Sequence, residues 1–173
     1  MGVIYLPPTK VSVDDQINQM VFLAGSIEMD KAENWQEKLG NKLRQIERLT
    51  ILNPRRKNWD SNWEQKITNA KFKEQVDWEL DGIDTCDTVI FYFDPNTKSP
   101  ITLMELGIVS AASEDKNVIV CCPEGFWRKG NVDILVSRMS KRIQNVISCN
   151  NLTELITKSY EFLEANDYDK WKS

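Results

Sequence analysis

Residues Thr88 to Phe93 read T-V-I-F-Y-F, and a little further on Ser99 to Gly107 read S-P-I-T-L-M-E-L-G. The first segment is an apolar run of strand length, and the second opens with a proline, which suits the first turn of a helix. The two predict a strand, a tight exit and a helix that carries the carboxylate of Glu105 in its second turn. The chain contains no histidine, so Glu105 is the leading candidate for reactive chemistry.

The alternation of strand and helix extends in both directions from this stretch. Short apolar runs predict five strands, at residues 21–24, 49–52, 88–93, 118–122 and 143–147. Residues at helical spacing predict five helices, near 35–46, 72–83, 101–112, 132–139 and 152–163, the first of them capped by Asp30. Such an order predicts an α/β fold with a five-stranded parallel sheet and helices on both faces. We expect residues 1–18 to be an irregular lead-in, 19–166 one domain and 167–173 a tail.

The amino-acid composition argues against nucleic acids and membranes as partners of this protein. The 173 residues include 41% hydrophobic residues and carry a formal charge of −4, which suits one core and disfavours general nucleic-acid binding. No apolar stretch approaches the roughly 20 residues of a membrane span. Residues 1–19 contain two aspartates and two prolines, unlike a signal peptide. We therefore expect a cytoplasmic protein without a membrane or nucleic-acid partner.

The four cysteines predict neither a metal site nor a disulfide framework. Cys86, Cys121, Cys122 and Cys149 form no C-x-x-C pair, and no histidine is available to complete a zinc site. We interpret them as reduced and mostly buried thiols, and we expect no metal and no cofactor.

Three segments should meet at one edge of the predicted sheet, because ligands of such folds bind outside the carboxyl ends of the strands. These segments are Gly25-Ser26, residues 53–56 and residues 94–105. Glycine lets a ligand approach the backbone, and the following amides and the Ser26 hydroxyl can donate to an anion. A plain turn is the alternative for this pair. The basic pairs Arg55-Arg56 and Arg128-Lys129 are either solvated surface or the partner of a small anion.

A carboxylate at position 105 has two interpretations. It can interact with the helix dipole only, or it can act as a nucleophile or base toward the anomeric carbon of a sugar, where a nearby anion stabilises an oxocarbenium-like transition state. The second interpretation calls for another acid, for which Glu79 on the preceding helix and Asp84 or Asp87 are candidates. A solvated helix face or a turn cap is the alternative for each of them.

These residues match a known family pattern. The chain resembles the nucleoside 2-deoxyribosyltransferase superfamily, including 2'-deoxynucleoside 5'-phosphate N-hydrolases and the nucleoside 2-deoxyribosyltransferase-like branch. The resemblance covers about residues 20 to 125 and rests on five segments: F-L-A-G-S-I at 22–27, N-P-R-R at 53–56, Q-V-D-W-E at 75–79, residues 87–93, and S-P-I-T-L-M-E-L-G at 99–107.

The resemblance implies a flavodoxin-like, doubly wound fold that cleaves N-glycosidic bonds without a metal. It implies that Glu105 is the nucleophile and that Glu79, at a position where many members have aspartate, assists at the base. It also implies that Gly25 and Ser26 help to hold a 5'-phosphate, as in the hydrolase branch.

Position 99 departs from the transferase pattern. Transferases acting on free nucleosides carry aspartate there, which accepts from the sugar 5'-hydroxyl, whereas nucleotide hydrolases carry serine, as this chain does. An aspartate would repel a phosphate dianion, and a hydroxyl can donate to it. Ser99 therefore favours a 5'-monophosphate, with Arg55, Arg56, Arg128 or Lys129 as possible sources of charge-assisted bonds.

Members of the family complete the site with a residue from a neighbouring subunit, and Asn131 is the best match in this chain. The helix at 132–139 presents Val132, Leu135, Val136 and Met139, which predicts either an interface of a homodimer or larger even assembly, or simply packing on the sheet. Trp59, Trp63 or Trp78 either stacks on a base or is structural.

Three functions are compatible with this sequence. The first is a glycosidase that hydrolyses a nucleotide or deoxynucleotide and releases the base. The second is a transferase that exchanges bases through a covalent glycosyl-enzyme. The third is a nucleotide-binding module without catalysis, because fold alone does not determine function.

Overall fold

The computed structural model describes residues 1–28, 32–112 and 115–169. These residues form a six-stranded parallel sheet in the spatial order β1-β3-β2-β4-β5-β6. The strands are β1 (Val3–Tyr5), β2 (Gln19–Gly25), β3 (Leu49–Leu52), β4 (Thr88–Tyr92), β5 (Asn117–Cys121) and β6 (Val146–Cys149). Without β1 this is the flavodoxin-like order, so the predicted fold class is confirmed.

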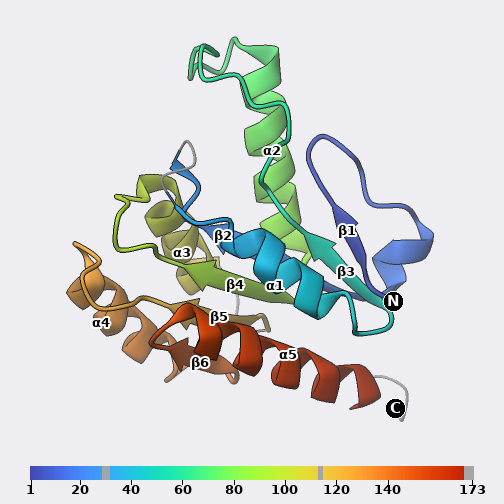
Figure 1. Cartoon of the computed structure of the whole chain (residues 1–173), viewed down its shortest axis with the longest axis vertical. Helices are drawn as coiled ribbons and strands as arrows, with labels where there is room; N and C mark the ends of the chain where they lie inside the picture. The colour runs from blue at the N-terminus through green and yellow to red at the C-terminus, as the bar shows by residue number, and fades with distance from the viewer. Residues whose placement is uncertain (29–31, 113–114, 170–173) are drawn as a thin grey trace.

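Helices cover both faces of the sheet, as predicted. The α-helices of the described residues are α1 (Trp35–Leu43), α2 (Ala70–Thr85), α3 (Pro100–Ala112), α4 (Lys129–Met139) and α5 (Leu152–Asp169). The helices α1 and α5 lie on one face, and α2, α3 and α4 lie on the other (Figure 1). Alternate residues of β2 face the two cores: Phe22 packs in the core beneath α2, α3 and α4, and Leu23 packs in the core beneath α1 and α5. Burial on both faces explains why the strands are near-continuous apolar runs.

Two details of the sheet differ from the prediction. The lead-in contains β1, which pairs in parallel with β3 and makes six strands rather than five. Three residues carry too little pattern to be recognised, and pairing with an existing edge makes β1 a strand. The last strand, predicted at 143–147, begins only at Val146. Ile143 is instead buried in a turn after α4, where its amide donates to the carbonyl of Met139 at 2.8 Å.

Helix starts follow local hydrogen bonding. The predicted cap Asp30 lies outside the described residues; α1 begins after Asn34, whose side chain accepts from the amide of Glu37. A short 3₁₀ helix, η1 (Asp14–Ile17), lies in the lead-in. There Asp15 accepts a hydrogen bond of 2.6 Å from the hydroxyl of Tyr5, which ties η1 to β1.

The helix α4 packs on the sheet. Val132, Val136 and Met139 belong to the buried core, with Leu135 packed against it. Of the two alternatives for this helix, these four residues support packing on the sheet, whereas Ile134 on the same helix is 66% exposed.

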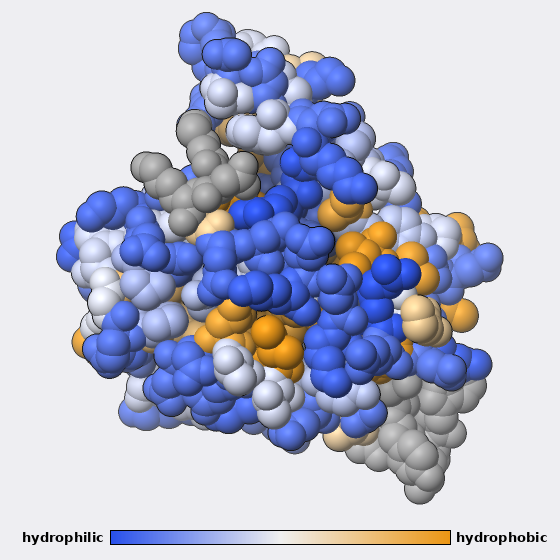
Figure 2. Space-filling model, in the orientation of Figure 1, coloured by the Kyte–Doolittle hydropathy of each residue, from blue (hydrophilic) through white to orange (hydrophobic). Residues whose placement is uncertain are grey.

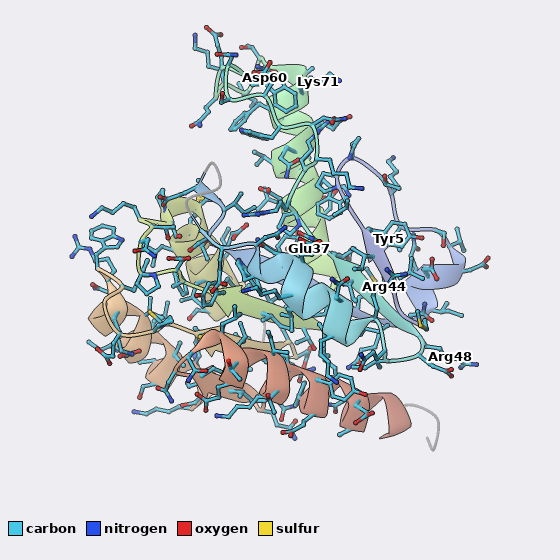
Figure 3. All side chains as sticks on the ribbon, viewed as in Figure 1. Tyr5, Glu37, Arg44, Arg48, Asp60 and Lys71 are labelled. Atoms are coloured by element: carbon cyan, nitrogen blue, oxygen red, sulfur yellow. The ribbon has the colours of Figure 1, made fainter. Side chains whose placement is uncertain are left out.

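An arm extends from the molecule. It consists of the connection between β3 and α2 (residues 53–69) and the N-terminal half of α2, and it stands away from the sheet (Figure 1). Asp60 and Lys71 mark its outer end (Figure 3). The viewed face is mostly hydrophilic, the arm included, with small apolar areas near the centre (Figure 2). Because the connection starts where β3 ends, the arm rises from the carboxyl edge of the sheet.

Two further findings concern the chain as a whole. All four cysteines are buried free thiols, as predicted. Within the described ranges, no helix combines the length and the apolar character needed to cross a membrane.

Candidate active site

The three predicted segments meet at the carboxyl edge of the sheet. Gly25 at the end of β2 is paired with Tyr92 at the end of β4, and the Ser26 amide donates to the Tyr92 carbonyl at 3.0 Å. Pro54, just after β3, is joined to α2 through a hydrogen bond of 2.9 Å from Gln75 to its carbonyl. The connections of β2 and β4 leave toward opposite sides, so this edge is the switch point at which such folds bind ligands.

Ser26 and Ser99 lie together in a buried cluster of hydroxyls. Their side-chain oxygens hydrogen-bond to each other, and the Thr97 hydroxyl lies 2.9 Å from Ser26 and 2.7 Å from Ser99. The amide of Asp94 donates to Ser26 Oγ at 2.9 Å. The Tyr92 and Asp94 carbonyls lie within reach as acceptors, so the cluster can satisfy its own protons. Ser26 and Ser99 lie close together, as the sequence predicted. Their hydroxyl groups, however, are hydrogen-bonded to other groups of the protein.

A carboxylate that the sequence did not single out lies against this cluster. Glu28 Oε1 accepts from the amide of Lys98 at 2.6 Å and from the amide of Ser99. These amides immediately precede α3, where the positive end of the helix dipole favours an anion. Glu28 and Ser99 have φ angles of 31° and 47°, a region that costs free energy for residues other than glycine. The two strained residues thus stabilise each other's conformation.

Helix α3 places Glu105 beside this edge. Pro100 is its first residue, and the Ser99 carbonyl accepts the first helical hydrogen bond, from Leu103. Glu105 follows in the second turn and is only 6% exposed. This burial removes the carboxyl group from most of the solvent, which disfavours its charged form.

Helix α2 supplies the second acid, Glu79. Its Oε1 accepts a hydrogen bond of 2.8 Å from Gln75, one turn earlier. Burial raises the pKa of Glu79 to about 7, against a smaller lowering by the Gln75 amide. The other two candidate acids lie at the opposite, amino edge: Asp87 accepts from the Met20 amide at 2.8 Å, and Asp84 is exposed at the end of α2. Among these three candidate acids, Glu79 is the one whose charge affects the pKa of Glu105.

The two glutamates act as a coupled pair. Burial raises the pKa of Glu105 to about 8, and the negative charge of Glu79 raises it further. Near neutral pH such a pair shares protons, so one carboxyl can be ionised while the other carries a proton. The cleavage of a glycosidic bond requires one carboxyl group as an acid and another as an anion.

Arg55 and Arg56 follow β3 at the base of the arm, and both are half-buried. The Arg56 guanidinium lies 5.1 Å from the ring centre of Trp63 and pairs with Glu74 through Nη2 at 2.9 Å. Its Nη1 is buried and finds no hydrogen-bond acceptor within the described part of the chain, so this nitrogen is available to an anionic ligand.

The tryptophans divide into two groups. Trp78 contacts Phe22 and donates to the Thr9 carbonyl at 2.9 Å, which is a structural role. Trp59 and Trp63 form an edge-to-face pair on the arm, with ring centres 5.2 Å apart, and they remain candidates for stacking.

Gly25 has a packing role. A Cβ added there would lie 2.5 Å from the Trp35 ring and 2.6 Å from the Tyr92 carbonyl oxygen. The space beside the glycine is thus filled by the protein, whereas the sequence had suggested room for a ligand.

The basic residues before and at the start of α4 make contacts within the protein instead of pointing to the carboxyl pair. Lys129 binds Asp133 and the Cys122 carbonyl, and Arg128 stacks on Trp127 at 4.3 Å. Asn131 is exposed on the first turn of α4 and is not brought to Glu79 or Glu105 of its own chain by any contact in the structure.

The sequence analysis assigned no role to three residues of the site: Glu28, Gln75 and Thr97. Gln75 stands four residues before Glu79, a helical spacing that could have identified it. Glu28 and Thr97 act through contacts between distant segments, and no local pattern marks them. Within the described residues, no group of three or more cysteine, aspartate and glutamate side chains is arranged to hold a metal ion.

Comparison with known proteins adds a family and a fold. A family model described as "Nucleoside 2-deoxyribosyltransferase like" matches residues 18–126, a span that includes Ser26, Glu79, Ser99 and Glu105. A search of curated proteins finds no match. Among solved structures, the chain is similar to a crystal structure of a conserved protein from Enterococcus faecalis V583, with 15% identity and a TM-score of 0.56. That likeness covers 86% of this chain and 99% of the other, and it concerns the fold alone.

Proposed function

Because the chain belongs to the nucleoside 2-deoxyribosyltransferase-like family, we propose that it is an enzyme that cleaves the N-glycosidic bond of a nucleotide or deoxynucleotide and releases the free base. The observation that carries this proposal is the pair of desolvated acids, the buried Glu105 and the half-buried Glu79, whose raised pKa values of about 8 and about 7 keep one proton available near neutral pH.

Each carboxyl has a role in this reaction. Glu105, in its ionised form, attacks the anomeric carbon, while Glu79 donates a proton to the leaving base. Since Glu105 has the higher pKa of the two, the single proton of the pair must pass from Glu105 to Glu79 before the attack. The bond between carbon and base nitrogen breaks as the bond to the Glu105 oxygen forms, and water then releases the sugar. No metal or other cofactor takes part in this scheme, since carboxyl groups supply both the nucleophile and the acid.

A 5'-monophosphate is the favoured substrate in this proposal. Ser99 carries no charge that would repel a phosphate. The unpaired Nη1 of Arg56 supplies a donor for an anion, and Arg55 lies beside it. The four buried thiols suit a reducing compartment, so a cytoplasmic location is part of the proposal.

A second candidate is favoured by Glu28. Its carboxylate occupies the amides of Lys98 and Ser99, the place where a phosphate would otherwise bind a helix N-terminus, and it would repel that phosphate. An unphosphorylated nucleoside avoids this repulsion. In that case the glycosyl group on Glu105 is passed to a second base, and the protein is a transferase.

One experiment separates the two candidates. The protein is incubated with a panel of nucleosides and their 5'-monophosphates, with and without a second free base, and the products are separated by chromatography. Release of base from monophosphates alone supports the first candidate, and exchange that requires a free second base supports the other. Glu28→Gln should improve turnover of monophosphates relative to nucleosides, because a repulsive charge is removed.

Variants of the nucleophile test the shared mechanism. Glu105→Gln and Glu105→Ala should abolish cleavage and leave the fold intact, whereas Glu161→Gln, an exposed glutamate on α5, should behave as the wild type. A folded Glu105 variant with near-normal turnover would remove this residue from the mechanism.

We also propose a homodimer or larger even assembly. Ile101 and Met104 on α3 are 55% and 51% exposed, on the helix that carries Glu105. A second copy packed there would bury this apolar surface and close the site from outside, with Asn131 of one chain reaching the site of the other. Mixing inactive Glu105→Ala and Asn131→Ala chains tests this arrangement, because recovered activity requires complementation between subunits.

A further inference from the structure

Gln75 connects Glu79 to the end of β3. It is only 5% exposed, and its Nε2 makes two hydrogen bonds, to the Pro54 carbonyl at 2.9 Å and to Glu79 Oε1 at 2.8 Å. Its Oε1 is buried and has no hydrogen-bond partner among the described residues. A buried amide oxygen without a partner is unfavourable. The position of this side chain is therefore explained by the two hydrogen bonds that its NH₂ group donates.

The two acceptors settle the orientation of the amide. A backbone carbonyl accepts only, so the group facing Pro54 must be the NH₂ group. If the amide were rotated by 180°, its oxygen would face the Pro54 carbonyl oxygen and Glu79 Oε1, and these two acceptors would repel it. One N–H therefore points at Glu79 Oε1 whether or not that carboxyl is protonated.

An oxygen that already accepts a hydrogen bond is the carbonyl-like oxygen of a protonated carboxyl. The proton of Glu79 then resides on the other oxygen, Oε2. The negative charge of Glu79 acts on Glu105 of α3 and raises its pKa, whereas Gln75 is neutral and orders the Glu79 proton without adding a charge.

We propose that Gln75 is a positioning residue that directs the proton of Glu79 to Oε2, toward the leaving base. This inference rests on the proposed function and goes beyond it by explaining how the acid is aligned. In the reaction, the proton moves from Oε2 to the base nitrogen, the pair of electrons of the broken glycosidic bond stays with the base, and the resulting carboxylate keeps its hydrogen bond from Gln75.

The test uses substrates that differ in their need for an acid. A nucleotide of an unmodified purine needs protonation of the base as it leaves, whereas the base of an N7-methylated purine nucleotide is already positively charged and leaves as a neutral base without a proton from an acid. Gln75→Met and Gln75→Leu should lower kcat on the unmodified substrate by about 10- to 100-fold, part of the usual contribution of general acid catalysis. The same variants should lower kcat on the N7-methylated substrate by less than about threefold.

The matched control is Gln36→Leu. Gln36 on α1 is also fully buried, and neither polar atom of its side chain has a hydrogen-bond partner in the described residues, but it lies on the other face of the sheet. It should affect both substrates equally. An equal loss on both substrates in the Gln75 variants would overturn the inference and leave Gln75 a merely structural residue.

A measurement on the wild-type protein needs neither a folded variant nor a substrate. The side-chain NH₂ signals of Gln75 are followed by nuclear magnetic resonance while the carboxyl groups are titrated. One of the two Gln75 protons should shift with the same midpoint as the Glu79 carboxyl carbon, and the Gln36 signals should not. Absence of that shift refutes the contact, whereas a shift in a protein that cleaves no substrate would count against the proposed function alone.

Discussion

Replacing Glu105 by glutamine should stabilise the folded protein, and the gain should grow as the pH rises. Burial, with the charge of Glu79 adding to it, raises the pKa of Glu105 from 4.5 to about 8. The folded protein therefore binds this proton more tightly than the unfolded chain does. For an acid with a raised pKa, folding stability falls as the pH rises from the unfolded value toward the folded one. Glutamine has no proton to lose, so the variant escapes this decline.

The size of the effect follows from the shift. Integrating the binding of one proton between pH 5 and pH 8 gives about 3.5 kcal/mol, an upper value because relaxation and water entry reduce the cost of a buried charge. For a chain of this size, that corresponds to about 7–14 °C in Tm. Any cost of burying the glutamine amide is independent of pH, so the difference between the two pH values isolates the ionisation.

Urea unfolding at pH 5 and pH 8 measures this difference in the wild type, Glu105→Gln and the exposed control Glu161→Gln. The Glu105 variant should gain stability relative to the wild type on going from pH 5 to pH 8, and the control should not. An equal offset at both pH values, or a smaller gain at pH 8, would show that the Glu105 carboxyl is not desolvated. The reasoning about the carboxyl pair would then fail.

Three other substitutions test separate features. Gly25→Ala should destabilise the fold by about 2 kcal/mol or more, because the added Cβ would lie 2.5 Å from the Trp35 ring; Gly130→Ala, with nothing within 4 Å, is the control in urea unfolding. Ser99→Asp should lower kcat/KM for 5'-monophosphates more than for nucleosides, and an equal loss on both would argue against a phosphate near this residue. Ile101→Asp should shift the sedimentation coefficient toward that of the monomer. A wild-type protein that already sediments as a monomer would refute the proposed assembly.

The sequence was most informative where a pattern is local. Burial on both sides makes a strand such as β4 a continuous apolar run, and a proline followed by helical spacing marks the start of α3. Their junction predicted both the fold class and the position of Glu105. The three residues of β1 escaped prediction because the edge of β3 makes them a strand, and Ile143 was misplaced because an apolar residue in a buried turn looks like one in a strand.

The candidate site divides in the same way. Glu79 and Glu105 were identified because they stand in motifs on helices, and Ser26 and Ser99 because they follow strand ends. The contacts of Glu28 depend on the backbone of a loop seventy residues later in the chain, which no pattern near residue 28 reports. The hydroxyl cluster likewise satisfies itself in a way that individual serines do not reveal.

Any tilt of helix α2 about its C-terminal turns would displace its two ends unequally. Gly82 lies against the Phe22 ring, where an added Cβ would be 2.8 Å away, and this close packing makes the C-terminal turns the fulcrum. At a rise of 1.5 Å per residue, Glu79 lies about 4.5 Å from that point and Ala70, at the outer end, about 18 Å. A swing that displaces the tip by about 4 Å therefore moves the Glu79 backbone by only about 1 Å. Such a tilt would therefore move the outer end of the arm much further than it moves Glu79.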